Sequence, residues 1–342
     1  MNSQQYSLLK EKINSREFSS IFILVDENTD KYCLEKFLNK TGISLYTKLL
    51  IKSGEENKNL ETCYYLWGEL SSFKADRKSL LINLGGGVLT DLGGFVASTY
   101  LRGIKFYNVP TTLLGMVDAA HGGKTGVDFN NLKNQIGVFK DPEEVILDSE
   151  FLLTLNKKEY LNGFAEIFKH SLITDNRNLN FNSLLKYDFY DDIDFIITKY
   201  SQIKNNIVES DRLESNIRKT LNLGHTIGHA IESYSHFSNN IDQLKHGEAI
   251  IIGLISELYL SSKILGYPID EVDNFKNTCN IYFEKKYIKE EDYEIIYDLM
   301  SYDKKNTQNK INFVLLDIDG NPVIDQKVNM KEFCNSLDYY NS

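Results

Sequence analysis

The chain has 342 residues, of which 42% are hydrophobic and 25% are charged, with 21 glycines and only 4 prolines. This composition is ordinary for a globular protein and excludes collagen-like, mucin-like and wholly disordered classes, and the length favours two domains. Because 38 Lys and Arg residues stand against 48 Asp and Glu residues, the net charge is −10, which argues against a partner that is nucleic acid or an anionic membrane.

Short β-like runs alternate with helical stretches in the first half of the chain. The runs that predict strands are residues 20–25, 48–51, 79–84 and 104–109. Residues 59–74 and 90–100, between them, have the apolar spacing of helices. Strands and helices in alternation predict βαβ units. We therefore expect residues 1–150 to form an α/β domain with a mostly parallel, doubly wound, Rossmann-like sheet.

Long stretches with a 3.6-residue apolar period dominate from about residue 151 onward. They cover residues 157–174, 192–209, 218–234, 246–265 and 270–282. Residues 311–317 read as an isolated strand or hairpin arm. We expect residues 151–342 to form an all-α domain, with a cleft between the two domains where a small molecule binds.

The cysteines are far apart and show no CxxC spacing, which indicates free thiols in a reducing compartment: Cys33, Cys63, Cys279 and Cys334. The first residues are polar and lack the apolar stretch of a signal peptide. The longest stretch without polar side chains, residues 249–255, is far shorter than the ~20 residues of a membrane helix. We expect a cytoplasmic enzyme with no membrane partner.

Three consecutive glycines, Gly85 to Gly87, follow a predicted strand and precede a predicted helix. In this geometry, backbone N–H groups and a helix N-terminus receive a phosphate or pyrophosphate. The alternative is a tight turn, but the strand–turn–helix setting favours the phosphate site. The spacing is not GxGxxG, so the ordinary dinucleotide fingerprint is absent. The polar loop with Glu55 and Lys58 suits ribose hydroxyls, although it could also be a solvated turn.

A second cluster, residues 118–134, holds Lys124 after a glycine pair, followed by Lys133 and Asn134. Two lysines and an amide near a mobile glycine segment would make a phosphate clamp. The same lysines could instead be solvated on a surface loop, which is the usual state of lysine. This segment by itself leaves both interpretations open.

Residues 218–229 carry the strongest functional pattern. Arg218, Asn222, His225 and His229 are spaced by four, three and four positions, so we expect them on one face of a helix. A single histidine on such a face is more often a satisfied core residue. Two histidines, an arginine and an asparagine are hard to bury without a ligand, because each needs a polar partner.

A carboxylate and two imidazoles from separate helices could fill three of the four positions of a catalytic zinc site. Glu166 lies within one predicted helix and His246 begins another. The spacing does not decide whether His225 or His229 is the third ligand. Thr226 follows His225 where a metalloprotease HExxH motif has Glu, so that class is disfavoured.

Together these segments resemble the 3-dehydroquinate synthase family of sugar-phosphate cyclases. The resemblance covers roughly residues 20–320 and rests on motifs in the family's order, namely GGGVLTDLGGF (85–95), PTTLL (110–114), GGKTGVD with KNQIGVF (within 122–139), GFAEIFKH (163–170), RKTLNLGHTIGHAIE (218–232) and HGEAI (246–250). It implies an NAD-binding α/β domain, a helical metal-binding domain and a homodimer. The implied reaction converts 3-deoxy-D-arabino-heptulosonate 7-phosphate to 3-dehydroquinate and phosphate, in the shikimate pathway of aromatic amino acid biosynthesis.

The resemblance also implies roles for single residues. It assigns Zn2+, or Co2+, to Glu166, His225 and His246. The positions that match NAD contacts are Asp26, Asn28, Glu55, Lys58, Gly86, Gly87, Val88, Asp91, Thr111, Thr112, Lys133, Phe151, Thr154, Leu155 and Glu159. The implied catalytic residues are Lys124, Asn134, Lys169, Glu214 and His229. The implied substrate-binding residues are Arg102, which would reach the partner subunit's phosphate site, with Asp118, Lys204, Arg218, Asn222 and Lys304.

One departure from the family concerns the residues after Asp118. The family usually has Ser-Ser-Val or Ala-Ser-Val there, and this chain has Ala119, Ala120 and His121. A His121 side chain that points inward would alter phosphate handling or a local pKa, and one that points outward would mean little.

Three other functions compete with this one. Another sugar-phosphate cyclase, acting on a substrate without a carboxylate, would have no task for Arg218 and Lys204 as a carboxylate clamp. A metal-dependent polyol dehydrogenase would form NADH from glycerol, whereas the synthase shows no net NADH. A non-catalytic relative would have no need for all three metal-ligand candidates.

Overall fold

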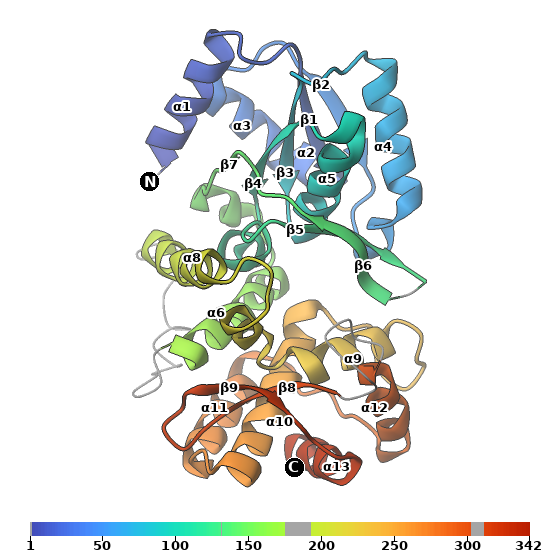
Figure 1. Ribbon diagram of the computed structural model, residues 1–342, viewed down its shortest axis with the longest axis vertical. Coiled ribbons are helices and arrows are strands. Elements are labelled where there is room, and N and C mark those ends of the chain that lie inside the picture. The colour runs from blue at the N-terminus through green and yellow to red at the C-terminus, as the bar shows by residue number, and fades with distance from the viewer. Residues whose placement is uncertain (1, 131, 175–192, 302–310) are drawn as a thin grey trace. The chain divides into compact units, whose positions relative to one another are not determined.

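The computed structural model describes residues 2–130, 132–174, 193–301 and 311–342 (Figure 1). The chain divides into two compact units: unit 1 is Met1–Tyr160 with Ile193–Asn205, and unit 2 is Leu161–Asp192 with Asn206–Ser342. The boundary that we expect after residue 150 falls close to the end of the first segment of unit 1. Within the described ranges, no helix is both long and apolar enough to cross a membrane.

Unit 1 is built around a parallel sheet whose strands, among the described residues, lie in the order β2-β1-β3-β4-β7 (Figure 1). Their bounds are Ile21–Asp26 (β1), Thr47–Ile51 (β2), Leu80–Gly85 (β3), Lys105–Pro110 (β4) and Glu144–Val145 (β7). β3 is buried at every position, as expected for a strand covered on both faces. The predicted doubly wound, Rossmann-like sheet is confirmed, and the four predicted strands are β1 to β4.

The strand order creates a switch point between β1 and β3. The chain leaves β1 toward β2 on one side and returns to β3 on the other side. In open α/β sheets, ligands bind beyond the carboxyl ends of the strands at such a point. Asp26 ends β1 and Gly85 ends β3, so the segments that follow these residues are placed for a ligand.

The helices of unit 1 include two that the apolar spacing predicts, α4 and α5. The helical bounds are α1 (Asn2–Asn14), α2 (Glu27–Tyr32), α3 (Leu34–Thr41), α4 (Leu60–Ser72) and α5 (Gly87–Thr99), with 3₁₀ segments η1 (Glu55–Asn57), η2 (Tyr100–Arg102) and η4 (Ser149–Thr154). Asn59 is the N-cap of α4 and accepts a hydrogen bond from the Thr62 N–H. α5 starts at Gly87, three residues before its predicted start, so the last of the three glycines is already helical.

Residues 118–134, which the sequence left as a phosphate clamp or a surface loop, lie mostly in regular structure where they are described. They belong to a π-helical turn, η3 (Gly115–Ala119), and an antiparallel hairpin of β5 (Lys124–Phe129) and β6 (Leu132–Phe139). Gly126 and Gly137 face each other in this hairpin. A Cβ atom on Gly126 would lie 2.7 Å from the Ile136 carbonyl oxygen, so glycine allows the strands to approach closely.

Unit 2 is mostly helical, as predicted, and α10 lies at its centre. Its elements are most of α6 (Lys157–Thr174), the end of α8 (Ile193–Ser210), η5 (Ile217–Asn222), α9 (His225–Ser235), α10 (His246–Leu265), α11 (Ile269–Tyr282), η6 (Glu290–Asp292), α12 (Tyr293–Ser301), β8 (Phe313–Leu316), β9 (Pro322–Gln326) and α13 (Met330–Asn341). α9, α11, α13 and β8 pack against α10. The hairpin of β8 and β9 corrects the all-α expectation, and β8 is the strand predicted within 311–317.

The predicted helix 218–234 is wrong at a position that matters for the site. The chain forms η5 and then α9, with a break at Gly224, whose φ is +77°. A Cβ atom at this position would lie 2.6 Å from Leu254, and a positive φ also favours glycine. Arg218 and Asn222 therefore lie on a separate turn and do not share a helical face with the histidines of α9.

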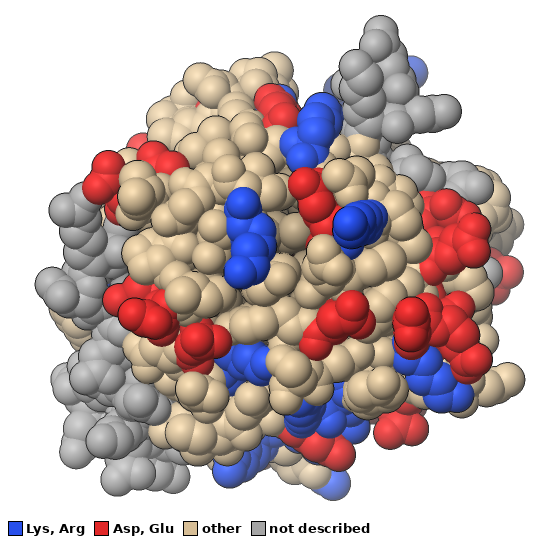
Figure 2. All heavy atoms as spheres, turned by 90° about the horizontal axis from the view of Figure 1, so that it is seen from below, with Lys and Arg blue, Asp and Glu red and all other residues tan. Residues whose placement is uncertain are grey.

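The charged side chains are mixed in sign on the face drawn in Figure 2. Lys and Arg side chains lie beside Asp and Glu side chains there, and among the coloured residues neither sign forms a continuous block. Ion pairs in unit 2 follow the same pattern, since Lys286 contacts Glu284 at 2.9 Å and Lys289 contacts Glu291 at 3.3 Å.

Candidate active site

In unit 1, the predicted cofactor residues gather at the carboxyl ends of β1, β3 and β4. Asp26 is the N-cap of α2, and its Oδ1 accepts hydrogen bonds from the backbone N–H groups of Asn28 (2.9 Å) and Thr29 (2.8 Å). Thr111 and Thr112 directly follow β4, and the Thr111 N–H donates to the Gly85 carbonyl at 3.0 Å. The first two contacts fix the turn after β1, and the third joins the ends of β3 and β4.

The glycine run lies in the strand–turn–helix setting that the sequence predicts. Gly86 is the N-cap of α5 and provides no side-chain cap. A Cβ atom on Gly86 would lie 3.1 Å from Thr112, and one on Gly87 would lie 2.9 Å from Ala119. Bare amides at the positive end of a 13-residue helix are suited to an anionic group, and Val88 adds the next amide of this turn.

A buried lysine organises the next part of unit 1. Lys58 Nζ lies 2.7 Å from Asp91 Oδ2 and 2.7 Å from Asn134 Oδ1. Burial opposes its charge, but the carboxylates of Asp91, Glu55 and Asp128 raise the pKa of Lys58 above its usual value. Its ammonium group is therefore charged at neutral pH.

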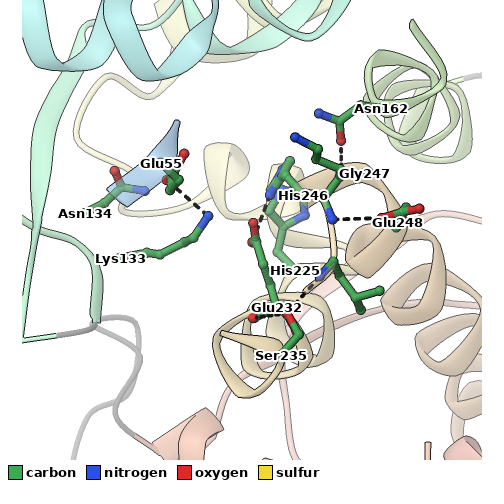
Figure 3. Close-up of polar contacts among 12 residues, drawn as sticks. Glu55, Lys133, Asn134, Asn162, His225, Glu232, Ser235, His246, Gly247 and Glu248 are labelled. Atoms are coloured by element: carbon green, nitrogen blue, oxygen red, sulfur yellow. Dashed lines mark hydrogen bonds and ion pairs between the residues drawn. The ribbon is translucent and has the colours of Figure 1, made fainter. Parts of the chain in front are cut away.

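Two further residues extend this network. Lys133 Nζ pairs with Glu55 Oε1 at 3.1 Å (Figure 3). The Asn134 N–H donates to Asp128 Oδ1 at 2.7 Å, and Asn134 has a φ of +52°. The structure thus brings together Glu55, Lys58, Asp91, Lys133 and Asn134, which come from three separate segments of the sequence.

Asp118 and Lys204 form a second cluster in unit 1. Lys204 Nζ donates to Asp118 Oδ2 at 2.6 Å and to the Asp118 carbonyl at 2.8 Å. His121 points inward beside this pair, and its Nε2 lies 2.9 Å from the Met116 carbonyl. Burial and the charge of Lys204 lower the pKa of His121 to about 4, so its imidazole is neutral at pH 7.

The other predicted residues of unit 1 lie on other segments of the chain. Arg102 is exposed at the end of η2, where it and Leu101 both have positive φ angles (69° and 50°). Lys124 is exposed at the start of β5. The remaining positions lie on η4, directly after it, or in the first turn of α6: Phe151, Thr154, Leu155 and Glu159.

In unit 2, the predicted metal ligands converge on one point. Glu166, fully buried on α6, has its Oε1 3.3 Å from His225 Nε2 and 3.4 Å from His246 Nε2. Its other oxygen contacts Lys169, one turn along the same helix. His229 lies beside them, and the ligand nitrogens of the three histidines are all within 4.8 Å of one another.

The second nitrogen of each ring explains why two of these histidines present Nε2. His225 Nδ1 donates to the Leu223 carbonyl at 3.1 Å, and His246 Nδ1 donates to Glu232 Oε2 at 3.2 Å (Figure 3). Occupying Nδ1 in this way fixes the ring and turns the Nε2 lone pair toward the ligand site. Glu166, His225 and His246 could therefore hold a divalent metal ion.

The two rings differ in their electrostatic environment. Burial and the charge of Lys169 lower the pKa of His225 to about 3, which keeps the imidazole neutral, as a metal ligand must be. Burial alone would lower the pKa of His246, but Glu232 and Glu166 raise it to about 9. With no metal bound, the carboxylates around His246 thus favour its protonated form, and a metal ion would have to replace the proton on Nε2.

The predicted substrate residues of unit 2 lie on the turn before α9. Arg218 is buried, and its Nη1 donates to the Arg212 carbonyl at 2.7 Å. Asn222 Nδ2 donates to Glu214 Oε1 at 2.9 Å. Asp211, which the sequence analysis missed, accepts hydrogen bonds from several backbone N–H groups of this turn, including that of Arg218 at 3.0 Å. Lys304 lies outside the described residues.

The sequence analysis also missed Glu232. This residue follows His225 and His229 at helical spacings of seven and three, so it lies on the same face of α9. The periodicity of α9 could therefore have indicated it, although its contact with His246 depends on the packing of α9 against α10.

Comparisons with known proteins identify the family of this chain. Models of the N-terminal and C-terminal parts of 3-dehydroquinate synthase match residues 48–162 and 163–306. The 3-dehydroquinate synthase of Parabacteroides distasonis is 39% identical over 338 residues, which are 98% of this chain and 95% of that protein. That of Alkaliphilus oremlandii is 40% identical over 308 residues, 87% and 82% of the two chains.

Solved structures show the same fold at lower identity. A 2-deoxy-scyllo-inosose synthase complexed with carbaglucose-6-phosphate, NAD+ and Co2+ matches with a TM-score of 0.82 at 23% identity, over 97% of this chain and 94% of that one. ValA, a 2-epi-5-epi-valiolone synthase from Streptomyces hygroscopicus with NAD+ and Zn2+ bound, matches with a TM-score of 0.83 at 23% identity, with the same coverage. The family models and the full-length relatives confirm the resemblance seen in the sequence: the chain belongs to the 3-dehydroquinate synthase family.

Proposed function

We propose that this protein converts 3-deoxy-D-arabino-heptulosonate 7-phosphate to 3-dehydroquinate and phosphate, with NAD and Zn2+ or Co2+ as cofactors. The observation that carries the proposal is the convergence of Glu166 Oε1 with the Nε2 atoms of His225 and His246 at 3.3 and 3.4 Å, in a chain of this family. One carboxylate and two imidazoles leave a position open for substrate, as catalytic zinc sites do.

The cofactors supply the bond-breaking chemistry, and the protein holds and orients the reactants. When bound, a divalent ion would make a substrate hydroxyl more acidic, and NAD would supply a reversible hydride acceptor. Gly86, Gly87 and Val88 at the N-terminus of α5 would bind the pyrophosphate. Lys58 and Lys133 hold Asp91 and Glu55 in position to accept hydrogen bonds from ribose hydroxyls.

Positive side chains would bind the two anionic ends of the substrate. Arg218 and Lys204 would bind the carboxylate. Both side chains are already oriented by hydrogen bonds within the protein, Arg218 to the Arg212 carbonyl and Lys204 to Asp118 Oδ2. The residues assigned to the phosphate are Lys124, Asn134, Asn222, His229, Lys304 and Arg102 of the partner subunit. Lys169 and Glu214 complete the catalytic set. A cytoplasmic homodimer is part of the same proposal.

The relatives favour this function over its alternatives. Full-length relatives that carry the synthase name are 36–40% identical, whereas cyclases that act on other sugar phosphates are 23% identical. A probable glycerol dehydrogenase from Sinorhizobium meliloti matches with a TM-score of 0.60 at 12% identity, which is a likeness of fold.

The test is phosphate release from the heptulosonate phosphate, with and without a chelator. Glu166→Gln should abolish release, and Arg218→Ala should lower kcat/KM about 10- to 100-fold, the value of a charged hydrogen bond. Lys219→Ala is the matched control, because this neighbour is half-buried and its ammonium group pairs at the surface with Asp325 at 3.0 Å. Unchanged turnover in either site variant, or NADH accumulation with glycerol instead of phosphate release, would refute the assignment.

A further inference from the structure

Glu257 is a buried carboxylate that the proposed reaction does not use. It lies in the middle of α10 with an exposed fraction of 0%. Its Oε2 accepts a hydrogen bond from the Gly224 N–H at 2.6 Å, and its Oε1 accepts one from the Ile227 N–H at 3.1 Å. Both amides belong to the N-terminus of α9, the helix that carries His225 and His229.

The start of α9 needs such an acceptor. The first N–H groups of a helix have no partner within the helix, and a side chain at the N-cap usually accepts from one of them. Here the N-cap is Gly224, which has no side chain and adopts a φ of +77°. A carboxylate from a neighbouring helix can replace the missing cap, because its charge suits the positive end of the helix dipole and strengthens both hydrogen bonds.

Close backbone contact brings Glu257 within reach of these amides. A Cβ atom on Gly253, one turn before Glu257, would lie 1.9 Å from the Gly224 carbonyl oxygen. A Cβ atom on Gly228 would lie 2.9 Å from Ile250. The first turn of α9 therefore rests on the backbone of α10, the same helix that begins with His246.

We propose that Glu257 is a positioning residue for the metal site, which holds the first turn of α9 against α10 and so sets the distance between His225 and His246. His225 lies between the two amides that Glu257 binds, so its backbone is held on both sides, and its ring is held by the Leu223 carbonyl. The inference rests on the proposed function in one respect: it takes His225 and His246 as metal ligands.

The test compares Glu257→Ala and Glu257→Gln with the wild-type chain, and it uses metal alone. Co2+ binding is followed by visible absorption, and Zn2+ affinity is measured by competition with a chromophoric chelator. Glu257→Ala should weaken Co2+ and Zn2+ binding about 10- to 100-fold and change the Co2+ absorption bands, since partners of metal ligands have effects of this size. Glu257→Gln keeps one acceptor oxygen, so its affinity should lie between those of the alanine variant and the wild type.

Ser256→Ala is the matched control. Ser256 is the preceding residue on α10, is equally buried, and its Oγ has no hydrogen-bond partner among the described residues. This variant should bind both ions as the wild type does. If the alanine variant does not fold, as judged by circular dichroism of the metal-free chain, the near-isosteric glutamine variant carries the test.

Wild-type affinity and wild-type Co2+ bands in a folded Glu257 variant would overturn the inference. The readout needs no substrate, so a wild-type chain that binds Co2+ but releases no phosphate would refute the proposed reaction and leave this inference standing. A wild-type chain that binds neither ion would refute both.

Discussion

Gly253→Ala should lower the stability of unit 2 more than the addition of a methyl group at any other position of α10. The new Cβ would lie 1.9 Å from the Gly224 oxygen and 2.8 Å from the Gly228 nitrogen, and both are backbone atoms that no rotamer change can move. This clash can be relieved only if α9 and α10 move apart. Overpacking of a tight interior usually costs 1–3 kcal/mol, and a backbone contact belongs at the upper end, so we expect the free energy of unfolding to fall by about 3 kcal/mol.

Gly68→Ala provides the matched control for Gly253→Ala. Gly68 lies within α4, is exposed, and a Cβ atom there would meet nothing within 4 Å. Alanine in an open helical position should raise stability by about 0.5–1 kcal/mol. Urea denaturation followed by far-ultraviolet circular dichroism gives both values, and a Co2+ titration of folded Gly253→Ala should show weaker binding. An unchanged urea midpoint together with unchanged Co2+ affinity would refute the view that direct contact between α9 and α10 sets the metal site.

Three other predictions follow from contacts described above. Glu232→Gln keeps the shape of the side chain but removes the charge beside His246, so Zn2+ binding in chelator competition should weaken about 10-fold, and equal affinity would contradict the role of Glu232. His121 has a folded-state pKa of about 4 against its ordinary 6.5, so the unfolded chain takes up the proton first and stability falls as pH drops from 6.5 toward 4. Urea unfolding should show that the free energy of unfolding of the wild type falls by about 2 kcal/mol between pH 7.5 and pH 5, and that the value for His121→Gln does not. Equal losses in both proteins would rule out His121 as the cause. Lys58→Met leaves Asp91 without its partner at 2.7 Å and should lower the free energy of unfolding by about 3 kcal/mol, part of which Asp91→Asn should restore; no recovery in the double variant would show that the pair is not the cause.

Local patterns were enough to predict β1 to β4 of the sheet in unit 1, but not the two-residue strand β7. Buried strands read as short apolar runs, and β1 and β3 have this pattern because helices or loops cover both faces. The hairpin of β5 and β6 was missed for a different reason. The glycine pair before Lys124 was read as part of a mobile segment, and nothing in the sequence showed that Gly126 and Gly137 allow two strands to approach closely, which only the pairing itself reveals.

The helix break before α9 was missed because the polar spacing runs straight through it. Periodicity counts which residues are polar and takes no account of φ, so Gly224 looked like one more helical position. The contacts that require the break, with Leu254 and Glu257, lie about thirty positions further along the chain. The residue types at 166, 225, 229 and 246 named candidate ligands but left His225 and His229 as alternatives, and only the family resemblance favoured His225. The choice of Nε2 over Nδ1 depends on Glu232 and the Leu223 carbonyl.

The placement of the candidate ligands raises an electrostatic problem that the surrounding carboxylates solve. His225 and His246 are the first residues of α9 and α10, so a cation held by both would lie near the positive ends of two helix dipoles. At the start of each helix, a carboxylate accepts hydrogen bonds from backbone N–H groups. Glu257 accepts from Gly224 and Ile227 at the start of α9. Glu248 accepts from the Lys245 N–H at 2.8 Å at the start of α10 (Figure 3). Because these acidic groups offset the positive ends, the carboxylates of Glu166 and Glu232 beside His246 remain able to attract a divalent ion.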